Sequence, residues 1–391
     1  MTADTARELD LIVYGATGFT GRLVAEYLAQ PRSGGSVKWA MAGRSLSKLQ
    51  AVRDEIGAPA DTPLLTANAD DPASLRALVT KARVIISTVG PYQLYGSDLV
   101  AACVETGTGY VDLCGEPNWM HDMIMQHDTA AKASGARIVF SCGFDSIPFD
   151  LGVWTVQQAA KARFGRPAPR VKGRVRKMQG TFSGGTFASG KATAAAAAKS
   201  PSVFKLLIDP FALTPGFVGP SQPKGMLPEY DEAVGGWVAP FVMAAINTKN
   251  VHRTNFLAGH PYGADFRYDE MMVAPWLGDI GKAAAEAIAK LNPMGGDKGP
   301  APGEGPSKAE REAGFYEIDF IAEMPDGQRL TATVTGDRDP GYGSTSKMIA
   351  EAALCLLEVG GSGWVWTPGA LMAEPLVKRL EANAGVTFKV A

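Results

Sequence analysis

Short apolar runs alternate with amphipathic stretches over the first part of the chain, up to about residue 145. The apolar runs cover residues 11–14, 37–42, 64–67, 84–88, 110–113 and 138–141. Stretches with helical spacing lie between them, at residues 20–29, 45–56, 72–81, 97–106 and 117–134. This alternation is typical of repeated strand–helix units whose strands lie parallel. We therefore predict an α/β fold with a Rossmann-type, doubly wound parallel sheet of six strands.

The pattern changes after Phe149, where the runs become longer and alternate between apolar and polar residues. Strands are predicted at residues 171–181, 241–247, 315–324 and 328–336. The last two flank the turn Pro325-Asp326-Gly327, and a turn of this composition between alternating runs predicts a β-hairpin. The second half is therefore expected to be an α+β domain built on a mostly antiparallel sheet.

Acidic and basic residues nearly balance, with 38 Lys and Arg against 40 Asp and Glu and a formal net charge of -2. Such a chain has no overall field that attracts a polyanion, so a nucleic-acid partner is not expected. The 4 cysteines are far apart and include no C-x-x-C pair, which argues against a disulfide framework and against a zinc site. We expect reduced thiols and no metal.

No segment of the sequence has the pattern of a secretory signal or of a membrane span. Residues 1–10 contain no apolar core, and the longest late apolar stretch, residues 348–366, is interrupted by Glu351 and Glu358. Carboxylates are tolerated better at the edge of a buried helix than in lipid. We predict a cytoplasmic protein with at most a peripheral membrane contact through an apolar patch.

A glycine-rich loop directly follows the first apolar run and opens the first amphipathic stretch. It consists of Gly15, Ala16, Thr17, Gly18, Phe19, Thr20 and Gly21. A strand, a glycine loop and a helix in this order form the fingerprint of dinucleotide-binding domains. The first glycine permits a tight turn, the second lets the backbone approach a pyrophosphate, and the third lets the helix pack close to the sheet.

The second apolar run is followed by Arg44, at the position where enzymes that use NAD carry an acidic residue for the ribose. An acidic residue would repel a 2′-phosphate, whereas Arg44 can bind it through two parallel hydrogen bonds. Ser45 and Lys48 add a further donor and a further positive charge. The sequence therefore predicts that the cofactor is NADP(H).

Two further strand ends are expected at the same crevice, because ligands of open parallel sheets lie outside the carboxyl ends of the strands. Asp70 and Asp71 follow the third run, where they could reach the adenine or its ribose or cap the next helix. Val89, Gly90 and Pro91 follow the fourth run. Gly90 would let the backbone approach the nicotinamide ribose.

Segments spread over nearly the whole chain resemble the saccharopine dehydrogenase-like oxidoreductases. They are residues 15–21, 42–44, 87–92 with 95–96, 110–116, 142–148, 183–186 and 339–345. Within that family they are most similar to the bacterial trans-acting enoyl reductases of lipid and polyketide synthesis. The resemblance implies an NADP-binding Rossmann domain (1–148), an α+β domain with the substrate face and dimer contacts (149–341) and a C-terminal helical segment that returns to the first domain (342–391). It also implies a homodimer.

Reduction of an enoyl or carbonyl group requires a hydride, which the cofactor supplies, and a group that stabilises charge on oxygen or donates a proton. The Y-x-x-x-K pair of short-chain reductases is absent, since no tyrosine has a lysine four positions later. Tyr92 and Asp145 are the candidate catalytic residues, because both are expected near the nicotinamide. Tyr92 could instead be a packing residue and Asp145 a helix cap. Cys142 is expected to be inert, since no histidine neighbours it in the sequence.

The second half is rich in aromatic residues, which suit a hydrophobic acyl chain better than an amino diacid. They are Phe182, Phe187, Phe204, Phe211, Phe217, Trp237, Phe241 and Trp276. Lys172, Arg174 and Arg176 alternate along a predicted strand, and would form a solvated sheet face or a docking surface for an acidic carrier protein or a lipid head group.

The leading hypothesis is an NADPH-dependent reductase of a hydrophobic acyl (enoyl) substrate, free or carrier-bound, in lipid or polyketide biosynthesis. Three alternatives remain open. They are a saccharopine-type amino-acid dehydrogenase, a lipid ketone reductase and a non-catalytic NADP(H)-binding interaction protein.

Overall fold

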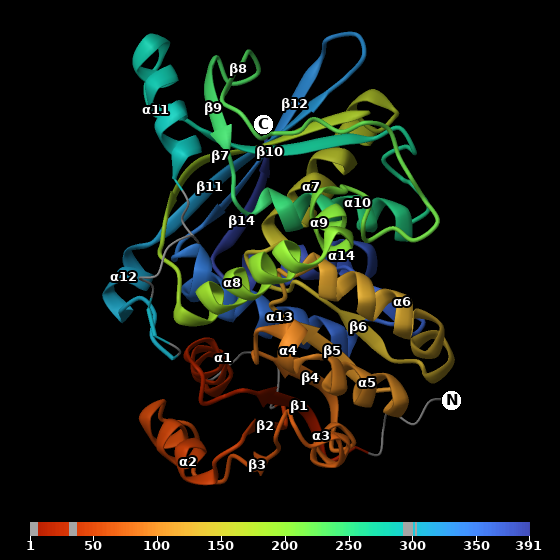
Figure 1. The fold of residues 1–391 in the computed structure, drawn as a ribbon, viewed down its shortest axis with the longest axis vertical. Coiled ribbons are helices and arrows are strands. Elements are labelled where there is room, and N and C mark those ends of the chain that lie inside the picture. Colours follow the sequence, from red (N-terminus) through yellow and green to blue (C-terminus); the bar gives the residue numbers. More distant parts are fainter. Residues whose placement is uncertain (1–6, 31–36, 292–299, 302) are drawn as a thin grey trace.

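The computed structural model describes residues 7–30, 37–291, 300–301 and 303–391. Two seven-stranded sheets lie one above the other, with helices packed between and around them (Figure 1). The first sheet is parallel and the second is mostly antiparallel. The predicted fold class is therefore confirmed.

The first sheet is formed mainly by the N-terminal part of the chain. Its strands, from edge to edge, are β13 (Trp364–Trp366), β6 (Arg137–Val139), β5 (Gly109–Asp112), β4 (Ala82–Ser87), β1 (Leu9–Tyr14), β2 (Trp39–Gly43) and β3 (Leu64–Thr66). The helices that follow these strands are α1 (Phe19–Ala29), α2 (Leu46–Glu55), α3 (Pro72–Val79), α4 (Tyr92–Tyr95), α5 (Ser97–Thr106) and α6 (Pro117–Ser134). Six strands coincide with the predicted runs. The seventh, β13, was not predicted, because its 3 residues join β6 from the far end of the sequence.

The second sheet is formed by the second half. Its strands, from edge to edge, are β14 (Val386–Val390), β12 (Arg329–Gly336), β11 (Phe315–Glu323), β7 (Arg170–Gln179), β10 (Arg267–Val273), β9 (Gly236–Pro240) and β8 (Glu229–Asp231). Its helices are α8 (Gly184–Lys199), α9 (Pro201–Ile208), α10 (Ala244–Leu257), α11 (Gly278–Lys290) and α12 (Lys308–Ala313). The predicted hairpin is present as β11 and β12. The strand predicted at residues 241–247 was wrong, since α10 begins there, and a short apolar run does not distinguish a strand from a buried helix.

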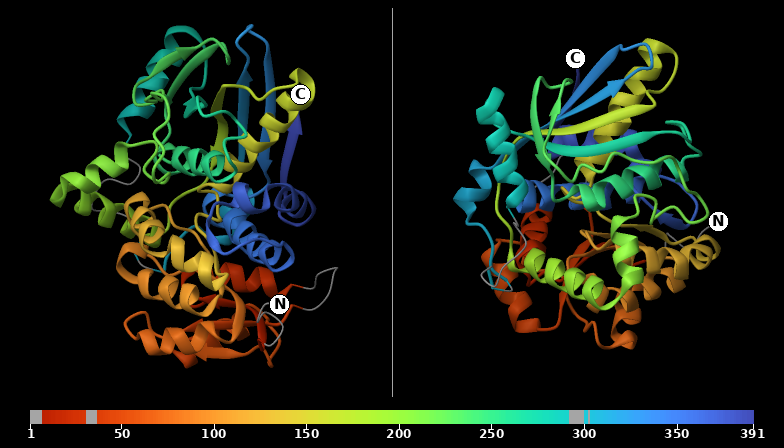
Figure 2. Two further views of the ribbon diagram at one scale, coloured as in Figure 1. Left: turned by 90° about the vertical axis from the view of Figure 1, so that its right-hand side faces the viewer. Right: turned by 45° about the horizontal axis from the view of Figure 1, so that its top comes forward.

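Three helices form a layer between the two sheets: α7 (Ile147–Phe164), α13 (Thr345–Glu358) and α14 (Pro368–Asn383) (Figure 2). One continuous cluster of buried side chains joins these helices to both sheets, from Val13 in the first sheet to Phe320 in the second. The two sheets therefore share one hydrophobic core.

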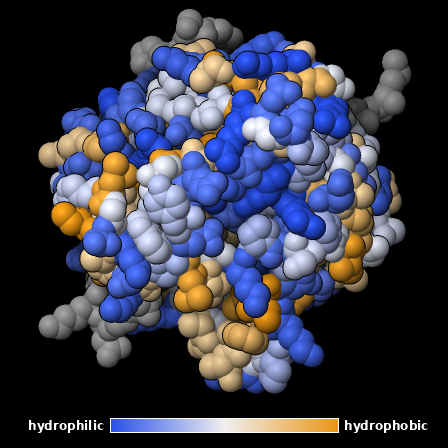
Figure 3. All heavy atoms as spheres, turned by 90° about the horizontal axis from the view of Figure 1, so that it is seen from above, coloured by the Kyte–Doolittle hydropathy of each residue, from blue (hydrophilic) through white to orange (hydrophobic). Residues whose placement is uncertain are grey.

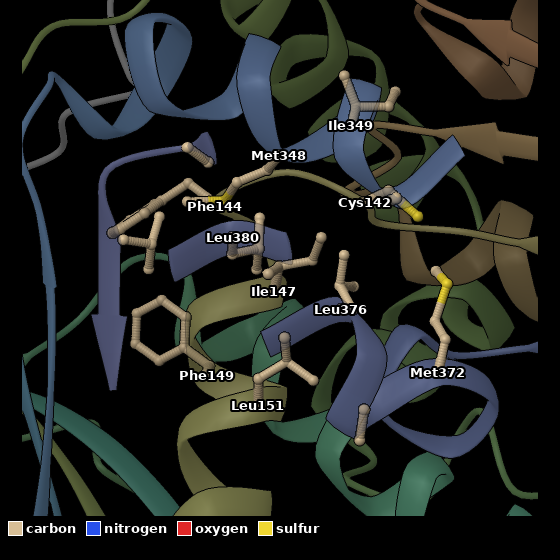
Figure 4. Close-up of a cluster of buried hydrophobic side chains, with 14 of the residues drawn as sticks. Cys142, Phe144, Ile147, Phe149, Leu151, Met348, Ile349, Met372, Leu376 and Leu380 are labelled. Atoms are coloured by element: carbon tan, nitrogen blue, oxygen red, sulfur yellow. The ribbon is translucent and has the colours of Figure 1, made fainter. Parts of the chain in front are cut away.

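The close-up of this layer shows Ile147 on α7 between Leu376 and Leu380 on α14 (Figure 4). Helix α7 also approaches the second sheet closely at Gly152, where an added Cβ atom would lie 2.2 Å from the ring of Phe320. A larger residue at this position would push the helix away from the sheet.

The C-terminal segment reaches both sheets. Residues 342–391 were expected to be helical, and they contain α13 and α14 but also two strands. Strand β13 extends the first sheet, and β14 extends the second. A short π-helical turn, η2 (Pro340–Ser344), connects β12 to α13. The end of the chain therefore holds the two sheets together.

Lys172 and Arg174 of β7 form neither a solvated face nor a docking surface, so that prediction was wrong for these two residues. The guanidinium of Arg174 is fully buried and donates to Asp231 at 2.7 Å and to Asp269 at 3.0 Å. Lys172 donates to Asp231 at 2.9 Å. Burial alone would raise the pKa of Asp231, but Arg174 and Lys172 hold it at about 2. Arg176 is the exposed member of the three.

Seen from above, hydrophilic residues fill much of the centre of the molecule's face, and apolar residues form smaller groups toward its margin (Figure 3). None of the helices in the described ranges combines the length and the apolar character that crossing a bilayer requires.

We expect Leu376→Ala to lower the free energy of unfolding by about 2–5 kcal/mol, because it removes a fully buried side chain from the shared core. Leu46→Ala is the matched control, since Leu46 is 47% exposed and its loss should change stability by about 0.5 kcal/mol or less. Urea unfolding of both variants measures the difference. Equal effects would contradict the shared core.

Candidate functional site

The glycine loop turns sharply between β1 and α1. Gly15 has a positive φ of 89°, and its N–H donates to the carbonyl of Ala42 at 2.9 Å. An added Cβ at Gly15 would lie 2.7 Å from Thr88 Oγ1, and one at Gly21 would lie 2.1 Å from the Gly15 carbonyl oxygen. Both glycines are therefore required by the close approach of the loop, the helix and the end of β4.

Gly18 is the N-cap residue of α1. It has extended dihedral angles, no side chain caps the helix, and the first turn carries no acidic residue. The other loop residues, Thr17, Phe19 and Thr20, are at least partly exposed, whereas Ala16 is buried. Uncapped N–H groups at the positive end of a helix dipole suit an anionic group such as a phosphate.

Arg44 lies directly after β2 with its side chain exposed. Within the described part of the chain, its guanidinium has no hydrogen-bond or ion-pair partner. Burial raises the pKa of Tyr14 to about 12, while the charge of Arg44 opposes and that of Asp70 adds to this rise. Arg44 and Asp70 therefore both lie near the end of β1. Ser45 caps α2 by accepting from the backbone N–H of Lys48 at 3.4 Å.

The ends of β3 and β4 border the same region. Asp71 caps α3 through the N–H groups of Ala73 and Ser74, whereas Asp70 is exposed. After β4, Val89 is half-buried, Pro91 is buried and Gly90 is exposed. Gly90 faces helix α8, where an added Cβ would lie 3.5 Å from Ser189 Oγ. Helix α8 therefore lies across the end of β4.

Tyr92 is buried, and both hydrogen-bonding capacities of its hydroxyl are used by the backbone. The hydroxyl donates to the carbonyl of Ser87 and accepts from the N–H of Leu113, each at 3.1 Å. Its backbone N–H donates to the carboxylate of Glu116 at 2.9 Å, and so does the N–H of Gln93. Burial raises the pKa of Tyr92 well above 10. This arrangement favours the packing role and weighs against Tyr92 as a proton donor.

Asp145 follows β6, and its carboxyl is half-buried. The N-cap residue of α7 is Ser146, and no side chain caps this helix, so Asp145 does not serve as the helix cap. No described residue donates a hydrogen bond to its carboxyl, and burial raises the pKa of Asp145 to about 7. Its charge contributes to the pKa values of Glu270 and Tyr342. Asp145 therefore lies where the first sheet meets the second.

Tyr342 in η2 forms one wall of this region. Its hydroxyl accepts from the N–H of Ser183 and lies 2.9 Å from Thr186 Oγ1 at the start of α8. Its ring packs edge-on against Phe19 of the glycine loop, with the centroids 5.1 Å apart. Thr345, which ends the same motif, accepts from the N–H of Phe144 at 2.9 Å. Four of the segments that carry the family resemblance, 15–21, 142–148, 183–186 and 339–345, therefore meet at one place.

A second polar group lies at this place, and the sequence did not predict it. Ser146, Asn247, Asn250 and Glu270 are each 1% exposed or less, and we call them the amide–carboxyl cluster. Asn247 Nδ2 donates to Glu270 Oε2 at 2.9 Å, and Asn250 Nδ2 donates to Ser146 Oγ at 2.9 Å. The sequence pattern did not place the two asparagines, three residues apart, on one helix, because residues 241–247 were predicted to be a strand.

One hollow lies beside α1 and α2 and is lined by Arg22, Glu55 and Lys308 among others. It contains Phe19 but no other residue of the glycine loop. It is therefore not the crevice at the strand ends. In the described ranges, no group of three or more His, Cys, Asp or Glu side chains is arranged to hold a metal ion. Cys142 is buried and donates to the carbonyl of Val139, as packing requires.

Comparison with known proteins decides the family. Residues 11–139 match the family described as Saccharopine dehydrogenase NADP binding domain. A putative trans-acting enoyl reductase of Mycobacterium tuberculosis is 40% identical over 417 residues, covering 100% of this chain and 99% of the relative. The chain belongs to the saccharopine dehydrogenase-like oxidoreductases. A trans-acting enoyl reductase of Mycobacterium ulcerans is 36% identical over 412 residues, covering 96% of each chain.

A solved structure has the same fold as this oxidoreductase. Apo saccharopine dehydrogenase (L-Glu forming) from Saccharomyces cerevisiae matches it with a TM-score of 0.53 and 12% identity, covering 98% of this chain and 99% of the other. At this identity the likeness concerns the fold alone. The predicted family and the NADP-dependent oxidoreductase class are confirmed by the relatives and by the matched domain.

The residues at the strand ends fit NADP(H), the cofactor of the matched domain. Gly15 and Gly21 keep the loop free of side chains, the start of α1 is uncapped, and Arg44 offers an unpaired positive charge beyond β2. An uncapped helix N-terminus suits the pyrophosphate, and a free guanidinium suits a 2′-phosphate.

We expect Tyr92→Phe to lower the free energy of unfolding by about 1–3 kcal/mol, because it leaves the Leu113 N–H without its acceptor. The affinity for NADPH and the turnover should stay within a factor of about two. Tyr95→Phe, at an exposed tyrosine three residues further on, is the matched control. Urea unfolding and cofactor titration measure both quantities. A large loss of turnover with unchanged stability would restore Tyr92 as a proton donor.

Proposed function

We propose that this oxidoreductase is an NADPH-dependent reductase of a hydrophobic enoyl substrate, carried as a thioester. The observation that carries the proposal is identity over the whole chain. Relatives named trans-acting enoyl reductase align with 100% or 96% of it, so the likeness includes the second half as well as the cofactor domain.

The cofactor site in this proposal is the region around the glycine loop. The loop residues Gly15 to Gly21 hold the pyrophosphate, Arg44 binds the 2′-phosphate with Ser45 and Lys48 beside it, and Asp70 faces the adenosine ribose. Residues 89–91 border the nicotinamide end. NADPH, when bound, supplies the hydride. Asp145 is the residue of this chain that donates the proton, since its carboxyl is free of hydrogen-bond partners and its pKa is raised to about 7 by burial.

The apolar part of the substrate has a candidate path along α8 and α9. Helix α8 crosses the end of β4 at Gly90, and α9 continues from it with Phe204 and Ile208 exposed by 53% and 64%. Exposed apolar side chains next to a cofactor crevice suit an acyl chain. The homodimer and a peripheral membrane contact stay predictions of the sequence.

The charges near the crevice argue against an amino diacid as substrate. The groups near the end of β6 are the carboxyls of Asp145 and Glu270 and amide oxygens, which repel or fail to bind carboxylates. Two cations of the second sheet, Lys172 and Arg174, are already bound by Asp231 and Asp269. The saccharopine-type alternative is therefore disfavoured. The lipid ketone reductase and the non-catalytic protein remain distinct outcomes of the substrate test.

We expect Arg44→Asp to weaken NADPH binding by about 1.5–3 kcal/mol, which is roughly 10- to 150-fold in Kd, because a charge-assisted hydrogen bond is lost and a repulsion is added. The Kd of NADH should change little. Arg329→Asp, at an exposed arginine of β12, is the control. Fluorescence titration with both cofactors measures the change. Equal losses for NADPH and NADH would remove Arg44 from the 2′-phosphate site.

We expect apparent affinity for enoyl thioesters to rise with acyl chain length by about 0.8 kcal/mol per CH₂, roughly fourfold, until the path is filled. NADPH oxidation over a chain-length series, beside 2-oxoglutarate plus lysine and a 3-ketoacyl thioester, measures the preference. Mass analysis of the product distinguishes C=C from C=O reduction. A flat length dependence, or faster turnover of the diacid or the ketone, would contradict the enoyl reductase.

A further inference from the structure

Helices α8 and α9 together form an arm, residues 184–208, that stands apart from the hydrophobic core. In α8 only Gly184 is buried, and α9 has no buried residue. In the left view of Figure 2 these two light-green helices project from the side of the molecule. Since a helix of a globular protein normally buries one face, the composition of the outer face of the arm requires an explanation.

The outer face of the arm consists of alanine, lysine and large apolar residues. Along α8 the exposed side chains recur at helical spacing, and they are Lys191, Ala194, Ala195, Ala198 and Lys199. Along α9, Phe204 and Ile208 lie four residues apart on one face and are exposed by 53% and 64%. Lys205 is exposed beside them. A solvated helix face normally carries charges of both signs, so this face suits an apolar partner better than water.

The charge of the arm has one sign. Residues 184–208 contain 3 lysines and neither aspartate nor glutamate, although the net charge of the whole chain is -2. Among the described residues, none forms an ion pair with Lys191, Lys199 or Lys205. Asp209 follows the arm directly, and its carboxylate accepts from the N–H of Phe211 at 2.8 Å. The arm therefore offers free positive charge beside its apolar side chains.

Polar contacts fix the arm at both ends. At its start, Thr186 Oγ1 lies 2.9 Å from the hydroxyl of Tyr342. At its end, Nζ of the buried Lys249 donates to the carbonyl of Leu207 at 2.8 Å. Between these points α8 crosses the end of β4 at Gly90. One side of the arm therefore borders the cofactor crevice, while the outer face keeps its orientation toward the solvent.

Three kinds of partner have to be distinguished for this face. A second copy of the chain would place the face against itself about a two-fold axis, which brings the lysines of both copies together without an acid between them. Interfaces with other proteins are depleted in lysine and alanine and enriched in aromatic residues and arginine. Helices that lie in a membrane interface combine lysine with phenylalanine and aliphatic residues, and the lysine stems lie along apolar surface while the ammonium groups stay in water.

We propose that the arm docks this oxidoreductase on a membrane surface that contains anionic lipids. Phe204 and Ile208 enter the boundary between head groups and acyl chains, and the three lysines bind the lipid phosphates. The arm lies on the bilayer and does not cross it. Because α8 also borders the end of β4, docking brings the crevice close to the lipid. This interaction surface goes beyond the proposed reductase function and does not depend on it.

Flotation of the full chain with lipid vesicles tests the docking. We expect binding to an equimolar mixture of phosphatidylcholine and phosphatidylglycerol, little binding to phosphatidylcholine alone, and weaker binding in high salt, which screens the lysines. Lys199→Gln with Lys205→Gln should lower the affinity for the mixed vesicles by about 25-fold, since each lysine near an anionic surface contributes roughly fivefold. Lys290→Gln with Lys389→Gln, at exposed lysines of α11 and β14, is the matched control.

The apolar contribution is measured with the same vesicles. Phe204→Ser with Ile208→Ser should lower the affinity by about tenfold or more, because these side chains no longer transfer apolar surface out of water. Leu46→Ser with Val390→Ser is the matched control, at residues that are exposed by 47% and 46%. Phe204→Trp locates the contact, since brominated lipids should quench its added fluorescence, whereas the added fluorescence of Leu46→Trp should stay unquenched. All these positions are exposed, so the fold should be retained.

Several outcomes would overturn the inference. They are no binding to the mixed vesicles, and binding that both arm variants retain. If a soluble acidic acyl carrier protein binds through the lysines of the arm and vesicles do not bind, the partner is a protein and not a membrane. If analytical ultracentrifugation shows a dimer that Phe204→Ser with Ile208→Ser abolishes, and vesicles do not bind, the partner is a second copy. None of these measurements uses turnover, so their result is independent of the test of the enoyl reductase.

Discussion

The layer of helices between the two sheets is the constraint on which the rest of the structure depends. Because α7, α13 and α14 pack into one core with side chains of both sheets, neither sheet can move without disrupting the other. The approach at Gly152 limits how far α7 can lie from the second sheet. The start of α7 is held next to α10, where Asn250 Nδ2 donates to Ser146 Oγ at 2.9 Å.

The polar groups at the strand ends are of two kinds. Asp112 and Glu116, at and after the end of β5, are paired: the Asp112 carboxylate accepts from Tyr110, Cys114 and Ser141, and Glu116 accepts from the first N–H groups of α4. These pairs stabilise the chain. Arg44 at the β2 end and Asp145 at the β6 end have no described partner. Since pairing within the protein would leave a polar group unable to bind a ligand, the unpaired groups are the ones suited to function.

The two faces of the second sheet differ in how their charged groups are paired. On one face, Arg174 and Lys172 are neutralised by Asp231 and Asp269, which allows a fully buried guanidinium. The face toward α10 carries Glu270 without a cation. Burial raises the pKa of Glu270 to about 8, so the sheet carries a structural ion-pair network on one face and a carboxyl of raised pKa on the other.

The sequence by itself determined the local elements and the cofactor end of the site. The alternation of apolar runs predicted six strands of the first sheet, and the loop from Gly15 to Gly21 with Arg44 after β2 predicted NADP(H), because these signals depend on residues close together in the chain. Only the tertiary structure decided the features that join distant segments. These include β13 beside β6, the ion pairs of Arg174, the backbone partners of the Tyr92 hydroxyl and the pairing of Asn247 with Glu270. Such contacts leave no periodic pattern in the sequence, since each partner is chosen by the packing of the helix layer.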